Sequence, residues 1–219
     1  MKILLIVVFL FTPFINAFGK NNNFQKNDKI IDELNQIPQY RNWIDFWKNK
    51  IPGIEGFILE KTDTVKYKYS TKTDVEKWLK GREFRKFTLD FSPKGSFVTD
   101  VYSHVGFEYK NDSIYVMGGD MDPSFEIVNI KDSILKHLTF GPYSFFDESL
   151  WVSDSICYIL GFAVDDINQD LSNVYGKILI LKWDLSKNIL TVNKSNRIQF
   201  VNKFMSFETY MDYLYPKFK

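Results

Sequence analysis

One acidic segment of the chain has the residue spacing of a calcium-binding loop. Asp166, Asn168 and Asp170 occupy positions 1, 3 and 5 of such a loop, where side-chain oxygens converge on the ion. Position 6, usually glycine, is Leu171, and position 12, usually glutamate, is Lys177. A lysine there would repel the cation, and the alternative is a solvated loop between strands. Calcium is the one cofactor that the sequence suggests.

A second acidic loop and two tryptophans offer a possible ligand rim. Asp120 and Asp122 follow two glycines in residues 118–123, a composition typical of a turn. Trp43 and Trp47 are one helical turn apart, so both rings lie on one helix face. Such rings either pack into a core or form an exposed ligand surface, and we expect the core-facing arrangement.

The sequence contains no recognisable catalytic constellation. His104 follows Asp100 by four residues, but neither G-x-S-x-G nor H-E-x-x-H occurs. Cys157 lies in an apolar stretch without a neighbouring histidine, which predicts a buried, inert thiol. The adjacent carboxylates Asp147 and Glu148 would point to opposite faces of a strand. We therefore expect a protein that is not an enzyme.

Composition excludes several other classes. Of 219 residues, 45% are apolar and 25% charged, as in a globular protein that can bury a substantial core. The 28 basic and 27 acidic residues create no net field that would attract nucleic acid. A single cysteine and two histidines rule out an internal disulfide, a Cys-rich zinc site and a three-His metal site.

The first residues have the pattern of a targeting segment. Residues 1–19 contain one lysine, an apolar run and small residues before a cleavage point, which predicts a signal peptide. The apolar run is too short to span a bilayer, and no cysteine near the cut could carry a lipid. We expect a secreted or periplasmic protein without a transmembrane anchor after cleavage, with residues 20–28 disordered.

The remaining chain, 29–219, reads as one domain with a helical lead-in at 29–82, a β body at 83–200 and a terminal helix at 206–215. The lead-in predicts helices at 29–36 and 38–49. Thr62-Asp63 predicts a hairpin turn between strands 56–61 and 64–69. Thr73 has the pattern of a helix N-cap, and Gly81 that of a left-handed helix stop. Polar turns rich in Asp, Asn, Lys and Ser separate the strands of the β body at 110–113, 131–133, 152–155 and 185–188.

The β body contains an internal repeat. Residues 91–99 and 151–158 each combine an aromatic residue, a polar turn and a buried strand. Residues 125–139 and 177–191 each combine an apolar strand, a polar turn and a second strand ending in Leu-Thr. The period is about 50 to 60 residues, typical of propeller-type arrays, with insertions at 104–112 and 165–175.

The F-S-P-K-G stretch at 91–95 resembles the aromatic-Ser-Pro-Asp-Gly turn of TolB-type β-propeller repeats. The hairpin at 127–139 resembles the one that closes a blade in that family. The resemblance covers residues 89–193, with Lys94 in place of the usual Asp and without the Pro and Gly in the second copy. It implies a scaffold for protein–protein contacts. A closed propeller needs at least four blades and only two are recognisable, so a sandwich or open sheet remains an alternative.

These observations predict a mainly β fold with α+β character at its ends, built of antiparallel blade-like sheets in a propeller-like or sandwich arrangement. Short N-terminal helices and a C-terminal helix complete it. The function we expect is non-enzymatic binding, with a protein of the cell envelope as partner rather than a small ligand, and no nucleic acid. The alternatives are a β-barrel that binds a small lipid or glycan, and a hydrolase acting on envelope or glycan material.

Overall fold

The computed structural model describes residues 28–200, with gaps at 49, 52–53, 55–56, 68, 112, 120–121, 142 and 167–173. The expected signal peptide, the disordered lead up to residue 27 and the terminal helix at 206–215 lie outside the described residues. Asn168, Asp170 and Asp120 lie outside them too. Asp28, which we expected in the disordered lead, is the first residue of a helix.

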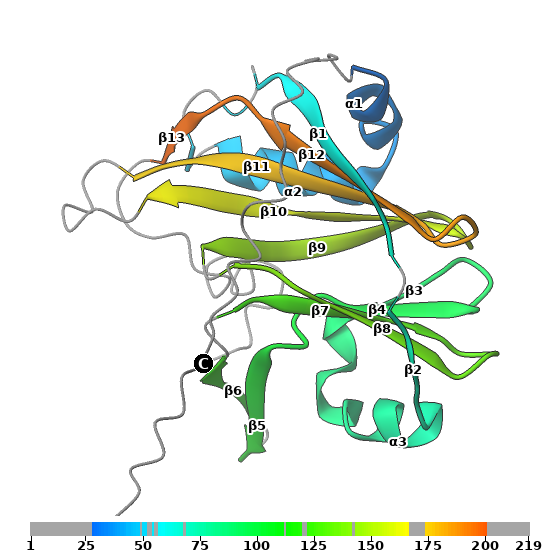
Figure 1. Ribbon diagram of the computed structural model, residues 1–219. Helices are drawn as coiled ribbons and strands as arrows, with labels where there is room; N and C mark the ends of the chain where they lie inside the picture. The colour runs from blue at the N-terminus through cyan, green and yellow to red at the C-terminus, as the bar shows by residue number, and fades with distance from the viewer. Residues whose placement is uncertain are drawn as a thin grey trace, which may run out of the picture.

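The mainly β class is confirmed. In the described part of the chain most strands belong to two antiparallel sheets stacked on one another (Figure 1). The large sheet has the order β1-β12-β11-β10-β9, with β13 also paired to β11. Its strands are β1 (Leu59–Lys66), β9 (Ser144–Ser153), β10 (Ile156–Asp166), β11 (Val174–Asp184), β12 (Ile189–Ser195) and β13 (Ile198–Phe200).

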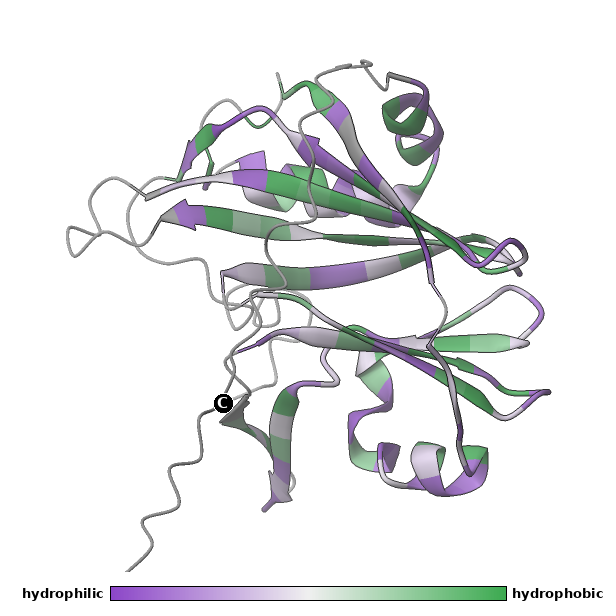
Figure 2. Ribbon diagram, viewed as in Figure 1, coloured by the Kyte–Doolittle hydropathy of each residue, from purple (hydrophilic) through white to green (hydrophobic). Residues whose placement is uncertain are grey.

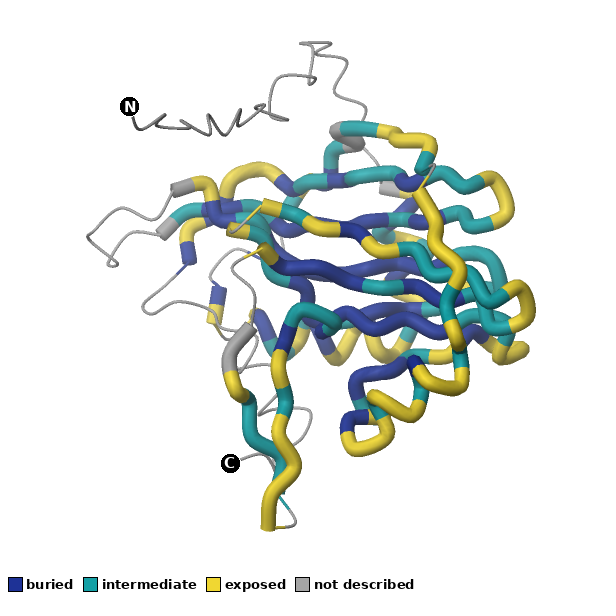
Figure 3. Tube along the Cα trace, turned by 60° about the horizontal axis from the view of Figure 1, so that its bottom comes forward, coloured by how far each residue is buried: buried dark blue, intermediate teal, exposed yellow. Residues whose placement is uncertain are grey.

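The small sheet has the order β2-β8-β7-β4-β3, and a separate hairpin pairs β5 with β6. The small-sheet strands are β2 (Thr71–Lys72), β3 (Leu89–Phe91), β4 (Phe97–Asp100), β7 (Ser124–Asn129) and β8 (Ile134–Thr139). The hairpin strands are β5 (Val105–Lys110) and β6 (Ser113–Gly119). The hairpin projects from the sandwich (Figure 1) and carries many exposed residues (Figure 3).

The internal repeat corresponds to two four-stranded meanders, β3-β4-β7-β8 and β9-β10-β11-β12. In each, the insertion separates the second strand from the third. Equivalent residues Ile127 and Leu179 share one buried cluster, as do Leu138 and Leu190. The two repeats therefore contact each other through equivalent faces. A contact between equivalent faces involves two repeats only, whereas a head-to-tail contact leaves a face free for a further repeat, as in a ring of blades. The described strands accordingly form a sandwich.

The expected hairpin around Thr62-Asp63 is wrong. Residues 59–66 form one continuous strand, β1, which pairs with β12 along its length, from Leu59↔Ser195 to Lys66↔Ile189. A register shift between Lys61 and Asp63 accommodates the polar pair as a bulge. Pairing with a strand far along the chain has outweighed the local turn signal, and this signal was weak because it lacks glycine.

Helices α1 (Asp28–Leu34) and α2 (Pro38–Lys48) cover the outer face of the large sheet, close to the ranges predicted. Trp43 and Trp47 are 0% and 1% exposed, which confirms the core-facing pair. Both rings contact Phe162 of β10, with centroids 5.3 and 5.0 Å away. Burial of such large side chains is what fixes these short helices on the sheet.

Helix α3 (Val75–Lys80) covers the outer face of the small sheet, and its ends differ from the prediction. The N-cap is Asp74 rather than Thr73, because the Asp74 carboxylate accepts the Lys77 backbone N–H at 3.0 Å. Gly81 has φ −63°, an ordinary right-handed conformation, so the expected left-handed stop is wrong. A 3-10 helix, η2 (Glu83–Thr88), then leads into β3.

The layers run helices, large sheet, small sheet, helix. The central strands β10 and β11 are apolar over runs of consecutive residues (Figure 2). Because successive side chains point to opposite faces, the large sheet has one apolar face toward the small sheet and another toward α1 and α2. Buried residues concentrate in these stacked strands (Figure 3). None of the helices described between residues 28 and 200 has the length and apolar content that crossing a membrane requires.

Candidate functional site

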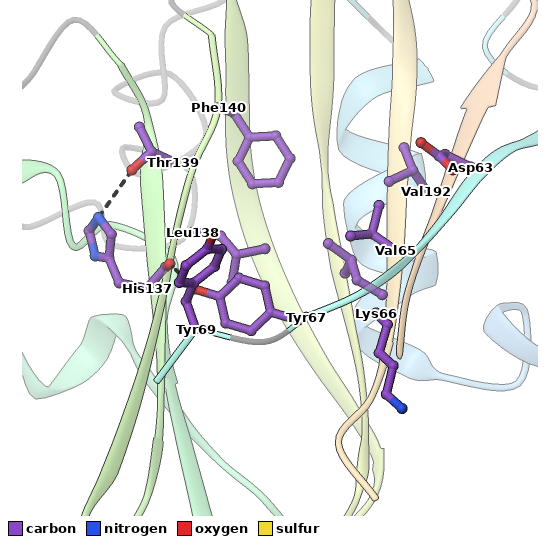
Figure 4. A pocket seen from close by; sticks show the side chains of 11 residues that line it. Asp63, Val65, Lys66, Tyr67, Tyr69, His137, Leu138, Thr139, Phe140 and Val192 are labelled. Atoms are coloured by element: carbon purple, nitrogen blue, oxygen red, sulfur yellow. Dashed lines mark hydrogen bonds between the residues drawn. The ribbon is translucent and has the colours of Figure 1, made fainter. Parts of the chain in front are cut away.

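A cleft opens between the two sheets at one edge of the sandwich (Figure 4). One wall comes from β8 and the residues after it, the other from β1 and β12, and the β1–β2 link crosses between them. Its cavity volume is about 560 Å³. The lining residues are Asp63, Val65, Lys66, Tyr67, Tyr69, His137, Leu138, Thr139, Phe140, Leu190 and Val192.

A second cavity continues the cleft between the sheets. It has a volume of about 290 Å³ and shares Asp63, Phe140 and Val192 with the first, so the two lie side by side. Its other lining residues are Gly141, Ser144, Ala163, Leu179, Leu181 and Lys194. We call the two together the inter-sheet cleft. Its walls are mostly apolar, with a few polar groups, as in sites for small apolar molecules.

Strand alternation explains why these side chains meet. Leu190, Val192 and Lys194 are every second residue of β12 and face the small sheet, whereas Asn193 between them is fully buried on the opposite face, where its amide donates to the Ile180 carbonyl at 3.0 Å. Among the described residues, β2 pairs only with the first two residues of β8, so beyond them the edge of β8 opposite β7 has no described strand beside it.

Tyr67 holds the two walls of the cleft together. Its hydroxyl donates to the His137 carbonyl of β8, and its ring lies edge-on to Trp183 at 5.1 Å. Partial burial raises the pKa of Tyr67 above its usual value. The neighbouring Tyr69 ring is 79% exposed and lies at the mouth, so an apolar surface continues out of the cleft.

His137 takes part in a hydrogen-bonded row on the rim. Its Nδ1 lies 3.3 Å from Glu126 Oε1, and its Nε2 lies 3.2 Å from Thr139 Oγ1. Glu126 also accepts from Arg82 Nη2 at 2.6 Å and from Trp78 Nε1 at 2.9 Å. The His137 ring turns away from the cavity that Leu138 and Phe140 enter (Figure 4). The row braces β8 against α3.

The structure places Trp43 and Trp47 away from the ligand rim that the sequence allowed. Both indole N–H groups donate to one oxygen of Asp147, at 3.0 and 3.1 Å. Burial raises the pKa of Asp147 to about 7, and the two indole hydrogen bonds oppose part of that rise. This buried contact ties α2 to β9. The other described rim residue, Asp122, is exposed and lines neither cavity.

The calcium hypothesis falls on residues that the structure mostly leaves out. Asp166 ends β10, and Asn168 and Asp170 lie outside the described residues. Within the described ranges there is no group of three or more His, Cys, Asp or Glu placed to hold a metal ion. The calcium site therefore stays a prediction.

The other candidate residues are part of the packing. Cys157 is fully buried between the sheets, where burial raises the pKa of its thiol, as expected for an inert cysteine. His104 Nδ1 lies 2.9 Å from the Ser124 carbonyl. Asp100 accepts from Arg82 Nε at 2.7 Å and Arg85 Nη2 at 2.9 Å, so it belongs to a buried ion-pair network rather than a relay to His104.

Sequence reasoning did not find the inter-sheet cleft. Its residues come from β1, β8, β9, β10, β11 and β12 and from the segments after β1 and β8, and no local motif marks them. Comparisons with protein-family models, curated proteins and solved structures gave no match.

Proposed function

We propose that this protein binds a small, apolar, lipid-like molecule in the inter-sheet cleft. The observation that carries the proposal is the pair of neighbouring cavities, the larger of which measures about 560 Å³, within the range of roughly 300–1,000 Å³ typical of small-molecule sites. The cleft opens to solvent, so its apolar walls face water when no ligand is bound. An apolar ligand would remove that surface from water. The cleft thus favours the lipid-binding alternative of the sequence analysis over a glycan or a hydrolytic role.

The test is binding of a neutral, environment-sensitive naphthylamine dye to wild-type protein and to a matched pair of variants. Val192→Trp places a large side chain at a residue that lines both cavities. Val152→Trp makes the same change on β9, at a residue that is 38% exposed and lines neither cavity. We expect saturable binding by the wild type and by Val152→Trp. For Val192→Trp we expect affinity reduced at least about tenfold, which corresponds to ~1.4 kcal/mol.

Circular dichroism and thermal melting of both variants show whether the fold is kept. If Val192→Trp is folded and binds the dye as tightly as Val152→Trp, the dye lies elsewhere and the proposal is wrong. Ala163→Leu, which fills the second cavity from β10, gives an independent reading should Val192→Trp fail to fold.

A protein partner is a second candidate, favoured by the β5–β6 hairpin. Its strands pair with one another and, among the described residues, with neither sheet. Tyr109 and Met117 on it are 56% and 63% exposed. Affinity capture from the cell envelope should lose its partner with Met117→Asp but keep it with Phe91→Asp, an equally drastic change at a 50% exposed residue of β3. Equal capture by both variants would count against the hairpin.

A further inference from the structure

The second cavity has one ammonium group in its wall. Lys194 lies on the cleft-facing side of β12, and its partner in register on β11 is Leu179, another lining residue. The lining also includes one carboxylate, that of Asp63, whose Oδ1 accepts the Thr64 backbone N–H at 2.6 Å. The remaining lining is apolar or small, so a ligand there would meet the lysine as its main polar contact.

No described carboxylate forms an ion pair with Lys194. Asp165 is instead paired with Arg197, with Nε 3.0 Å from Oδ2. Burial lowers the pKa of Lys194 below its usual value, the ammonium of Lys177 lowers it further, and Asp165 and Asp63 act in the opposite direction. The positive charge of Lys194 is therefore only partly balanced by the carboxylates around it.

The described carboxylates around Lys194 do not pair with it. Glu60 is its register partner on β1, and Asp63 and Asp165 act to raise its pKa, but none of the three forms an ion pair with the ammonium. A ligand carboxylate in the cavity would supply the missing ion pair, and in a partly desolvated site such a pair is stronger than at an exposed surface.

The cleft also has a direction. Leu190, Val192 and Lys194 follow one another on the same face of β12, and four residues of strand rise about 14 Å. An anionic group at Lys194 therefore places an apolar chain along Val192 and Leu190 toward Tyr67. That length suits a medium-chain molecule.

We propose that the ligand is a linear amphiphile with a single anionic headgroup, such as a carboxylate, which pairs with the Lys194 ammonium while its chain lies in the inter-sheet cleft. The inference rests on the proposed function and adds the chemical class of the ligand.

The experiment compares dodecanoate with 1-dodecanol, which has the same chain and no charge. Both are titrated at neutral pH as competitors of the neutral dye. We expect the wild type to bind dodecanoate at least about tenfold more tightly than dodecanol. Lys194→Met keeps the apolar stem and should remove this preference with little change in dodecanol affinity. Lys131→Met, in the exposed β7–β8 turn, is the control and should keep it.

Each outcome has one meaning. Equal affinity of the wild type for the two competitors, or a preference that survives in Lys194→Met, overturns the anionic headgroup while the cleft still binds apolar chains. Failure of both competitors to displace the dye, with dye binding insensitive to Val192→Trp, overturns the proposed function itself.

Discussion

Asp147 is the residue at which the helical layer and the large sheet are joined by hydrogen bonds rather than by packing alone. Two indole N–H groups converge on one of its oxygens, and its side chain is buried beneath α2. A carboxylate loses hydration at such a site, and two donors replace only part of it. The protonated form of Asp147 is therefore favoured in the folded protein and not in the unfolded chain.

This makes stability depend on pH. The folded pKa is about 7 and the ordinary value is 3.8, so between these values the folded state binds more protons than the unfolded state. The free energy of unfolding should fall as pH rises from about 4 to 7, by at most ~4 kcal/mol from this group. Asp147→Asn cannot ionise and should remove this part of the slope. Denaturant titrations at several pH values measure it.

Asp90 contributes with the same sign, because burial raises its pKa to about 6. The informative quantity is consequently the difference in unfolding free energy between wild type and Asp147→Asn at each pH. A difference that stays constant from pH 4 to 7 would contradict the assignment.

Sequence spacing predicted the burial of Trp43 and Trp47, but their shared partner lies 104 and 100 residues away and carries no local signal.

At the scale of elements, the hairpin turns were the most predictable features. The polar segments at 110–113, 131–133, 152–155 and 185–188 all join consecutive strands. Three contain a non-glycine residue with positive φ: Asn111, Ser133 and Asn188. Asn tolerates this conformation and Asp and Ser bond to nearby backbone, so the information for these turns is local. The wrong hairpin at Thr62-Asp63 and the wrong caps of α3 show the limit, because there strand partners and exact backbone geometry decide.

The turn between β3 and β4 gives the prediction at this scale. Asp154, in the β9–β10 turn, accepts the Lys94 backbone N–H at 2.9 Å, and hydrogen bonds from Ser92 and Ser96 lower its pKa. Lys94→Asp restores the residue usual in the resembled turn but places a second carboxylate beside Asp154. We expect a slightly lower melting temperature at neutral pH, with Lys94→Gln intermediate. The difference should vanish in acid, where Asp154 is protonated. A higher melting temperature for Lys94→Asp would contradict the expected repulsion between the two carboxylates.

At the scale of the whole molecule, the sandwich depends on which faces of the two repeats meet, and that is a property of tertiary packing. The sequence predicted strands, turns and the existence of a repeat. It left propeller and sandwich open, because periodicity shows which face of a strand is apolar and not what covers it. The inter-sheet cleft arises from the same packing, where the short β2 leaves one edge of the sandwich less closely covered than its centre.

The single cysteine reports on how the whole sandwich opens. Cys157 is fully buried between the sheets, with Sγ 3.8 Å from Thr99 Oγ1 of the small sheet. Burial also raises the pKa of its thiol. A disulfide reagent therefore reaches a reactive thiolate only when the sheets separate. We expect the labelling rate to give the same opening free energy as denaturant unfolding. A ligand in the cleft bridges both sheets, so dodecanoate at about 100 times its Kd should slow labelling about 100-fold. Labelling far faster than global unfolding allows would mean that the sheets part locally. Labelling unaffected by bound dodecanoate would mean that the ligand does not hold the two repeats together.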